Sequence, residues 1–515
     1  MDTKRAATAV EQLLLYGVDR GLIEEIDTIY VRNLLMDALR LVEPDDAFDK
    51  EKHVVPATVT PIMQEILDYA VGANIIGDTT TERDLFDTRL MGLLTPLPST
   101  ILKKYEAIKA KKGVKAATDY FYDLNQATDY IRVDRIKKNV KWEYNDEDYG
   151  NLEITINLSK PEKDPQEIAK LKNMPKMGYP ACMLCAENMG YAGRLNHPAR
   201  QSHRLLPVTL NEEQWYMQYS PYVYYNEHCI VLKGEHVPMF ICRDTFMRLL
   251  QFVDTFPHYF LGSNAGLPVV GGSILNHDHY QGGGYEMPMA KAPIYREFTF
   301  KDFPNVKAGA VKWPMTCLRL SCDSLETIAD AATHVLNAWE SYSDEALGIH
   351  AETNGEPHNA ITPIARKRGD NFEIDLVLRN NETSQEYPLG IYHPHPELHH
   401  IKKENIGLIE VMGLFILPGR LKDELKGIHD ILTGRVDFDA DELNNPAHPL
   451  HKHLPWIMHL VEEHGLICKD HAIDKLLQDD VGNICRRVLE DAGVFKDTEE
   501  GREGFASFLR SCNME

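Results

Sequence analysis

The feature that most constrains the fold of this chain is an order of segments that occurs twice. The first copy runs from strand-like runs at 222–225 and 229–232, through Phe246, Leu249, Leu250 and Val253 at helical spacing, to His277-Asp-His279. The second runs from a strand pattern over 315–320, through an amphipathic helix over 325–339 and a hairpin of 361–365 with 372–378, to His393-Pro-His395. Apolar residues three and four apart indicate helices, and alternation indicates strands. The order predicts an α+β fold with a duplicated strand–helix–strand–strand unit.

Helical patterns flank this duplicated part on both sides. Thr60-Pro61 is typical of a helix start, because the hydroxyl can cap and proline lacks an N–H that would go unused there. We also expect a basic amphipathic helix over 101–112, a strand over 152–158 and a loop over 160–165. The predicted divisions are 1–140, a helical N-terminal region; 141–300, the first unit; 301–420, the second unit; and 421–515, a helical C-terminal region.

Charge and composition narrow the classes of function. The chain has 515 residues and a formal net charge of −23, which argues against a general nucleic-acid binder because such proteins need a basic face. No run approaches the ~18 consecutive apolar residues of a transmembrane helix, and no secretory leader is expected from the polar start. Nine cysteines scattered over a long chain are not a disulfide framework. We therefore expect a cytoplasmic enzyme that binds neither nucleic acid nor membrane.

The segment Asn276-His-Asp-His-Tyr-Gln-Gly-Gly-Gly284 is the richest in chemistry. On an extended strand His277, His279 and Gln281 would share one face. A neutral imidazole whose other N–H is held by an acceptor can attack phosphorus. Gln281 could donate a hydrogen bond to a phosphate oxygen without having a proton to lose. A transferase whose leaving group is a phosphate monoester needs no acid at that position, whereas a hydrolase would profit from one.

Cys182-Met-Leu-Cys185 is ambiguous between a metal knuckle and a redox pair. Its flanks do not suggest the helix start of a thioredoxin-like unit. Tetrahedral zinc would need two further ligands, for which His236 and His277 are candidates. The alternative that no metal binds stays open at this point.

Several long motifs, with His277-Asp-His-Tyr-Gln281 at their centre, resemble the galactose-1-phosphate uridylyltransferases of the histidine-triad superfamily, in their second bacterial type. The motifs are 151–165, Cys182-Met-Leu-Cys-Ala-Glu-Asn188, 193–201, 218–228 and 271–279. The resemblance implies transfer of UMP from UDP-glucose to galactose 1-phosphate, giving UDP-galactose and glucose 1-phosphate through a uridylyl-histidine. It implies a duplicated antiparallel half-barrel with helices outside, a homodimer and no organic cofactor.

The resemblance also implies roles for individual residues. His279 would be the nucleophile, Gln281 would stabilise the α-phosphate oxygens, and the backbone carbonyl of His277 would fix the tautomer of His279. The implied substrate contacts are Asn226 and Glu227 for the nucleoside, Asn264 and Ser273 for the phosphates, and Arg194, Arg200 and Arg204 for anions. The implied structural zinc ligands are Cys182, Cys185, His236 and His277. Glu227 stands where the family has aspartate, and Asn-His-Asp-His replaces Asn-Pro-His-Pro-His of the other type.

Two rival functions use the same residues. A dinucleoside-polyphosphate phosphorylase or hydrolase would share the scaffold, although Gln281 in place of a third histidine speaks against the hydrolase. A non-catalytic module that binds zinc and nucleotide would bind UDP-sugars without exchanging label into hexose phosphate. The resemblance to the other type also points to His393 and His395 as the remnant of a second metal site, but the sequence defines no ligand set for it.

Overall fold

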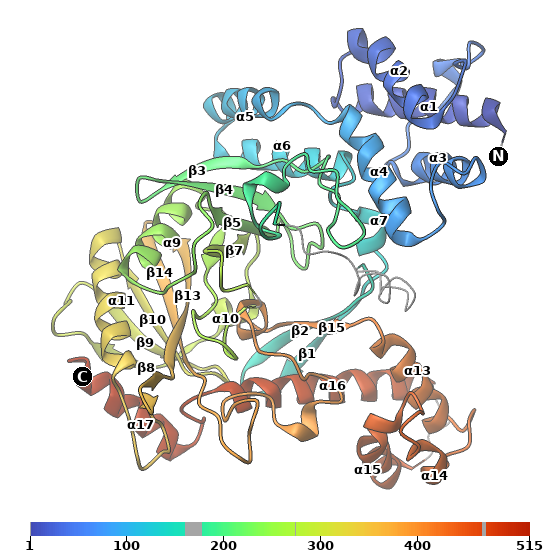
Figure 1. Cartoon of the computed structure of the whole chain (residues 1–515). Helices are drawn as coiled ribbons and strands as arrows, with labels where there is room; N and C mark the ends of the chain where they lie inside the picture. Colours follow the sequence, from blue (N-terminus) through green and yellow to red (C-terminus); the bar gives the residue numbers. More distant parts are fainter. Residues whose placement is uncertain (1, 160–177, 273, 466–469) are drawn as a thin grey trace. The chain divides into compact units, whose positions relative to one another are not determined.

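The computed structural model describes residues 2–159, 178–272, 274–465 and 470–515 (Figure 1). The chain forms two compact units, each built from separated stretches. Unit 1 comprises Met1–Lys138, Ser159–Val237 and His277–His279. Unit 2 comprises Asn139–Leu158, Pro238–Asn276 and Tyr280–Glu515. The predicted loop at 160–165 lies outside the described residues, and the fourfold division made from the sequence stays a prediction.

Unit 1 begins with helices, as the sequence predicts. They are α1 (Thr3–Asp19), α2 (Thr28–Leu39), α3 (Thr60–Gly72), α4 (Thr80–Leu94), α5 (Pro98–Lys112), α6 (Val114–Ala127) and α7 (Val133–Ile136). Helix α3 has proline in its first turn, and α5 ends immediately before Gly113. Ile62, Ile66 and Ala70, which recur at helical spacing along α3, are all buried. The predicted start of α3 at Thr60-Pro61 and the predicted end of α5 at Gly113 are confirmed, but the predicted cap by the Thr60 hydroxyl is wrong, because Val59 is the N-cap and no side chain caps this helix.

Antiparallel strands follow in unit 1. They are β3 (Leu206–Leu210), β4 (Glu213–Tyr219) and β5 (Cys229–Lys233). The predicted strand at 222–225 is wrong, because these residues form a turn. Val223 and Glu227 have φ of 39° and 54°, and the Ser220 hydroxyl accepts from the Tyr222 N–H. The alternating tyrosines resemble a strand pattern, but a backbone with positive φ cannot pair as one.

A large antiparallel sheet dominates unit 2. Its strands lie in the order β7 (His279–Gly283), β6 (Phe260–Gly262), β13 (Asn359–Arg368), β14 (Asn371–Asn380), β10 (Cys317–Cys322), β9 (Lys307–Val311) and β8 (Ile294–Thr299). The first residue of β7 belongs to unit 1 and the rest to unit 2. The predicted hairpin is confirmed, since β13 and β14 pair down to Arg368 and Asn371 at the turn.

Helices α9 (Arg243–Thr255) and α11 (Leu325–Glu340) pack against each other and against β13 (Figure 1). Phe246, Leu249, Leu250 and Val253 of α9 are fully buried, as are Ile328, Ala332, Val335 and Trp339 of α11. Along the chain, β5, α9, β6 and β7 are followed by β10, α11, β13 and β14 in the same order. The mixed α+β class and the repeated order agree with the sequence.

A smaller sheet and the C-terminal helices complete unit 2. Strand β2 (Gly150–Asn157) pairs with β1 (Val140–Asp146) antiparallel and with β15 (Leu414–Pro418) parallel. The remaining helices are α10 (Pro288–Lys291), α12 (Leu408–Val411), α13 (Leu421–Leu432), α14 (Ala440–Leu443), α15 (Leu454–His464), α16 (Asp470–Ala492) and α17 (Glu499–Ser511). The predicted helical tail is therefore present. In the described ranges, no helix combines the length and the apolar character needed to cross a bilayer.

Candidate active site and metal centre

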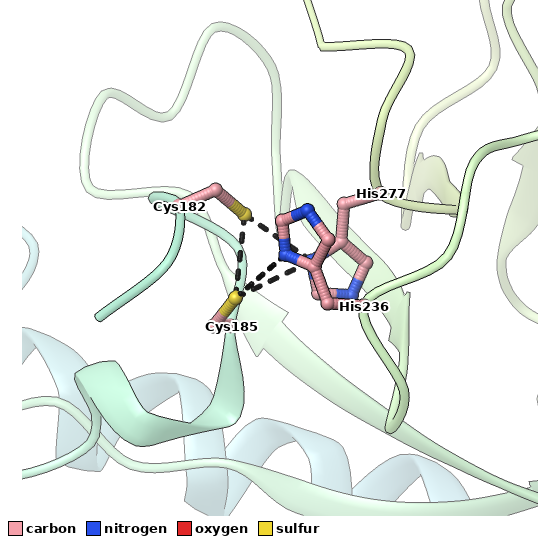
Figure 2. A group of neighbouring side chains, drawn as sticks. All are labelled: Cys182, Cys185, His236 and His277. Atoms are coloured by element: carbon pink, nitrogen blue, oxygen red, sulfur yellow. Dashed lines mark hydrogen bonds between the residues drawn. The ribbon is translucent and has the colours of Figure 1, made fainter. Parts of the chain in front are cut away.

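Two cysteines and two histidines converge in unit 1 (Figure 2). Cys182 and Cys185 come from the loop before β3, His236 follows β5, and His277 precedes β7. The ligand atoms of the four side chains all lie within 4.8 Å of one another. Within the described ranges, no other group of three or more His, Cys, Asp or Glu side chains converges in this way.

The distances inside this cluster fit tetrahedral zinc. The two sulfurs are 3.5 Å apart, and the Nδ1 atom of His277 lies 3.2 Å from Cys182 Sγ and 3.7 Å from Cys185 Sγ. His236 Nδ1 lies 3.1 Å from Cys185 Sγ. Zinc–ligand bonds of about 2.0–2.3 Å place tetrahedral ligand atoms about 3.3–3.8 Å apart. The donor types and these four distances therefore suit tetrahedral zinc.

The imidazole of His277 is oriented for such a role by the backbone. Its Nε2–H donates to the carbonyl oxygen of Lys233, 2.9 Å away at the end of β5. Because a carbonyl oxygen can only accept, this bond puts the proton on Nε2 and leaves Nδ1 as the ligand atom. The prediction that His277 shares a strand face with His279 is wrong. His277 lies in a bend before β7, so its ring turns to the cysteines instead.

His279 begins strand β7 and is 7% exposed. Its Nδ1–H donates to the backbone carbonyl oxygen of His277 at 2.8 Å, which is the contact that the family resemblance implies. This bond leaves the lone pair of the neutral ring on Nε2. Burial lowers the pKa of His279 below its usual value, and the bond to the His277 carbonyl opposes that shift.

Gln281 stands two residues further along the same strand and is half-buried. Alternation along a strand places the side chains of His279 and Gln281 on one face. Close packing requires glycine at position 282, because a β-carbon there would lie 2.1 Å from the Phe260 carbonyl oxygen of β6. Any residue with a side chain at this position would push strands β6 and β7 apart.

The predicted nucleoside contacts lie in the turn before β5, within unit 1. Asn226 is exposed, whereas Glu227 is 8% exposed. Lys115 of α6 interacts electrostatically with Glu227, and this contributes to the raised pKa of Lys115 after the dominant hydrogen bond to Asp119.

The three predicted arginines differ in their surroundings. Arg204 is 7% exposed, and its guanidinium donates to carbonyl oxygens of the chain itself. These acceptors are Thr95, Pro96, Gln201 and His203. Burial lowers the pKa of Arg204 to about 10. Arg194 donates to the Tyr179 carbonyl, the Tyr191 hydroxyl and Asn196, whereas Arg200 lies 5.6 Å over the Tyr130 ring.

The predicted phosphate contacts belong to unit 2. Asn264 is 4% exposed, and its Oδ1 accepts from the Leu408 N–H at 2.9 Å. A β-carbon at Gly272 would lie 2.8 Å from Asn264 Nδ2, so the amide side chain lies directly against the glycine loop. Ser273 lies outside the described residues.

Sequence reasoning missed the residues that support the Cys-x-x-Cys loop. Asn188 donates from Nδ2 to the carbonyl oxygens of both Cys182 and Cys185, at 2.8 Å each. Its position three residues after Cys185 was part of the family motif, but the motif does not say what the asparagine contacts. The Lys233 carbonyl was also missed, since any residue type could supply it.

The family models match most of the chain. Residues 21–238 match the N-terminal domain of galactose-1-phosphate uridyl transferase, and residues 252–433 match its C-terminal domain. The fold, the cluster and these matches define an α+β enzyme of the nucleotidyltransferase class.

Three bacterial relatives are each called galactose-1-phosphate uridylyltransferase. The one from Caldanaerobacter subterraneus subsp. tengcongensis is 52% identical over 100% of this chain and 99% of its own. Those from Fusobacterium nucleatum and Bacillus subtilis are 52% and 50% identical, over 97% of this chain and 97% and 96% of their own. The chain belongs to the galactose-1-phosphate uridylyltransferase family. The solved structure of yeast Ap4A phosphorylase Apa2 aligns with 64% of this chain and 90% of its own at 13% identity, with a TM-score of 0.33.

Proposed function

We propose that this chain transfers UMP from UDP-glucose to galactose 1-phosphate, with His279 as the covalent nucleophile. The observation that carries the proposal is the 2.8 Å bond from His279 Nδ1 to the His277 carbonyl, on the strand that also bears Gln281. The bond selects the tautomer whose Nε2 can attack. The substrate assignment is supported by relatives called galactose-1-phosphate uridylyltransferase, which are 52% and 50% identical to this chain over nearly its whole length.

In the first half-reaction, His279 Nε2 attacks the α-phosphorus of UDP-glucose. The new N–P bond forms as the bond from phosphorus to the bridging oxygen breaks, and that oxygen leaves with its electron pair as glucose 1-phosphate. The leaving group is already an anion that needs no proton. In the second half-reaction a phosphate oxygen of galactose 1-phosphate attacks the same phosphorus, and the N–P electron pair returns to Nε2.

The His277 carbonyl and the Gln281 side-chain amide are proposed to stabilise the charges that develop in this reaction. The ring of uridylylated His279 carries a positive charge, which the His277 carbonyl stabilises through the Nδ1–H bond. Gln281 is proposed to donate to a non-bridging α-phosphate oxygen, where negative charge is held in the transition state. Neither group gains or loses a proton during the cycle, which suits a reaction that runs through the same states in both directions.

We propose that the Cys182, Cys185, His236 and His277 cluster holds a structural zinc ion. When bound, zinc would supply a cross-link rather than chemistry at phosphorus. His277 connects the two functions, because its ring belongs to the cluster while its carbonyl holds His279. No organic cofactor is proposed.

Substrate contacts are proposed for Asn226 and Glu227 with the nucleoside, and for Asn264 and Ser273 with the phosphates. Arg194 and Arg200 are proposed anion contacts. Of the three arginines, Arg204 is the weakest candidate for an anion contact, because carbonyl oxygens of the chain itself already accept hydrogen bonds from its buried guanidinium. A cytoplasmic homodimer is proposed on the family resemblance alone.

Isotope exchange tests the proposed reaction. The enzyme is mixed with UDP-glucose and labelled glucose 1-phosphate, without galactose 1-phosphate. A covalent intermediate predicts that label enters UDP-glucose at a rate compatible with turnover. Absence of exchange in an enzyme that still makes UDP-galactose would exclude the two-step route. Turnover of a bis-adenosyl polyphosphate in place of UDP-glucose would favour a dinucleoside-polyphosphate phosphorylase instead.

A further inference from the structure

The buried side-chain amide of Asn188 contacts the backbone of the Cys-x-x-Cys loop. Asn188 ends the short 3-10 turn Ala186–Asn188 and is 1% exposed. Its Nδ2 donates to the Cys182 and Cys185 carbonyl oxygens, at 2.8 Å each. Its Oδ1 lies 2.6 Å from His197 Nε2. One side chain therefore connects both cysteine residues to a histidine that is nine residues further along.

The orientation of the amide follows from its partners. Carbonyl oxygens can only accept, so the Nδ2 hydrogens of Asn188 must face the two cysteine carbonyls. The Oδ1 atom then faces His197, and the proton of that ring must be on Nε2. Both amide hydrogens and one oxygen lone pair are used, which leaves little freedom for the side chain to rotate.

His197 is itself held by the loop that contains it. The N–H of Arg194 donates to the His197 carbonyl at 2.8 Å, and the His197 N–H donates to the Arg194 carbonyl at 2.9 Å. The ring meets Tyr191 edge-on, with centroids 5.4 Å apart, and Arg194 bonds to the Tyr191 hydroxyl at 2.6 Å. His197 is 6% exposed. The donor that anchors Asn188 is therefore fixed by contacts outside the cysteine loop.

We propose that Asn188 and His197 are positioning residues that hold the Cys182–Cys185 loop in its metal-binding conformation, and so set the affinity for zinc. The inference rests on the proposed zinc site and goes beyond it. Asn188 holds the backbone carbonyls of Cys182 and Cys185, which are both proposed zinc ligands. One amide therefore helps to orient both sulfurs. Groups that orient metal ligands from behind typically contribute about 10–100-fold in metal affinity.

The test measures zinc affinity by competition with a chromophoric chelator, and the cobalt(II) spectrum as a report of ligand geometry. Asn188→Leu keeps a similar volume but offers no donor to the two carbonyls. We expect its zinc dissociation constant to rise about 10–100-fold, with an altered thiolate–cobalt band. His197→Leu should weaken zinc binding in the same direction, whereas His197→Gln keeps an N–H donor and should largely restore it. These readouts do not depend on turnover.

Asn196→Leu is the matched control. Asn196 lies next to His197, and its side chain accepts from Arg194 at 2.7 Å rather than contacting the cysteine loop. Its zinc affinity should equal that of the wild type. If Asn188→Leu does not fold, the His197→Leu and His197→Gln pair decides the question. Wild-type affinity in folded Asn188→Leu, or equal losses in His197→Leu and His197→Gln, would overturn the positioning role. A wild-type chain that binds no zinc would instead overturn the metal site itself, and the inference with it.

Discussion

The segments His277-Asp-His279 and His393-Pro-His395 share the His-x-His spacing, but their hydrogen bonds differ. In His277-Asp-His279, one nitrogen of each ring donates to a backbone carbonyl, that of Lys233 or that of His277. The other nitrogen of His277 faces the cysteines, and that of His279 carries the lone pair. Each ring thus has its tautomer fixed while one nitrogen stays available for chemistry.

In His393-Pro-His395, both nitrogens of His395 and the Nδ1 atom of His393 contact acceptors of the protein. The His395 ring contacts the Ile391 carbonyl at 3.2 Å and Asp491 Oδ1 at 3.4 Å, and it stacks on Tyr387. His393 contacts the Pro394 carbonyl at 3.1 Å and the Asn405 side chain. His279 thus keeps a lone pair on Nε2, whereas both nitrogens of His395 face acceptors of the protein, so the spacing of the histidines alone does not indicate a reactive site.

The largest expected effect is the loss of the nucleophile. His279→Gly should lower kcat by about 10⁴-fold or more, because no other group can form the bond to phosphorus. Free imidazole should restore UDP-sugar chemistry by entering the vacated space. His395→Gly is the control from the other segment, and imidazole should not change its rate. Complete loss of UDP-sugar chemistry in folded His279→Gly with imidazole present would contradict the nucleophile assignment.

Gln281 should have the next largest effect. Gln281→Ala removes the proposed donor to the α-phosphate oxygen, which should lower kcat by about 10²–10³-fold with a smaller change in KM. Steady-state kinetics with both substrates separates the two constants. An increase in KM at unchanged kcat would mean that Gln281 contributes to ground-state binding only.

Loss of a metal ligand should follow. Cys185→Ser should reduce zinc affinity by more than the about 10–100-fold cost of an outer contact. We also expect a lower Tm and a lower kcat, because the His277 carbonyl would lose its anchor. Cys242→Ser is the control, since Cys242 is exposed and outside the cluster. Elemental analysis showing wild-type zinc in Cys185→Ser would argue against the assigned ligand set.

The sequence predicted those parts of the fold that depend on residues close together in the chain. The start of α3, the end of α5 and the hairpin of β13 with β14 follow from residues close together in the chain, and all were predicted. The bend at His277 was not, because its cause is the contact with Cys182, which is 95 residues away. The alternating pattern of His277, His279 and Gln281 favours a strand until that distant contact is known.

The sequence predicted which residues form the candidate site, but not the residues whose hydrogen bonds hold them in place. The four cluster residues and the His277 carbonyl were named from the family motifs. Asn188 and the Lys233 carbonyl were not, since their roles depend on where backbone carbonyls lie after folding. Arg204 has the residue type of an anion contact, and only the folded chain brings four of its own carbonyls to the guanidinium.

The second histidine segment should affect stability rather than catalysis. His395→Ala removes contacts to Ile391 and Asp491 and should lower the free energy of unfolding by about 1–3 kcal/mol. At the same time kcat should stay within about 3-fold of the wild type, since this ring has no free nitrogen to offer. Denaturant unfolding and kinetics on the same preparation measure both. If His395→Ala lost as much kcat as is expected for Gln281→Ala, the claim that only the His277–His279 segment takes part in catalysis would be contradicted.

The smallest expected effect is a dependence of stability on pH. Burial lowers the pKa of His393, with smaller contributions from neighbouring His399 and His395, while Pro394 and Asn405 oppose the shift. The unfolded chain then binds the proton more readily, so stability falls as pH drops below about 6.5 toward the lower folded pKa. The slope from one ring cannot exceed about 1.4 kcal/mol per pH unit. His393→Asn should flatten the unfolding curve in this window, and an unchanged slope would contradict a buried neutral ring.

The most direct test of the central claim is the intact mass of the protein after mixing with UDP-glucose alone and quenching without acid. The account predicts one acid-labile UMP adduct per chain, on the peptide containing His279, with stoichiometric release of glucose 1-phosphate. An enzyme that binds UDP-glucose but forms no adduct and releases no glucose 1-phosphate, or an adduct on another residue, would contradict it.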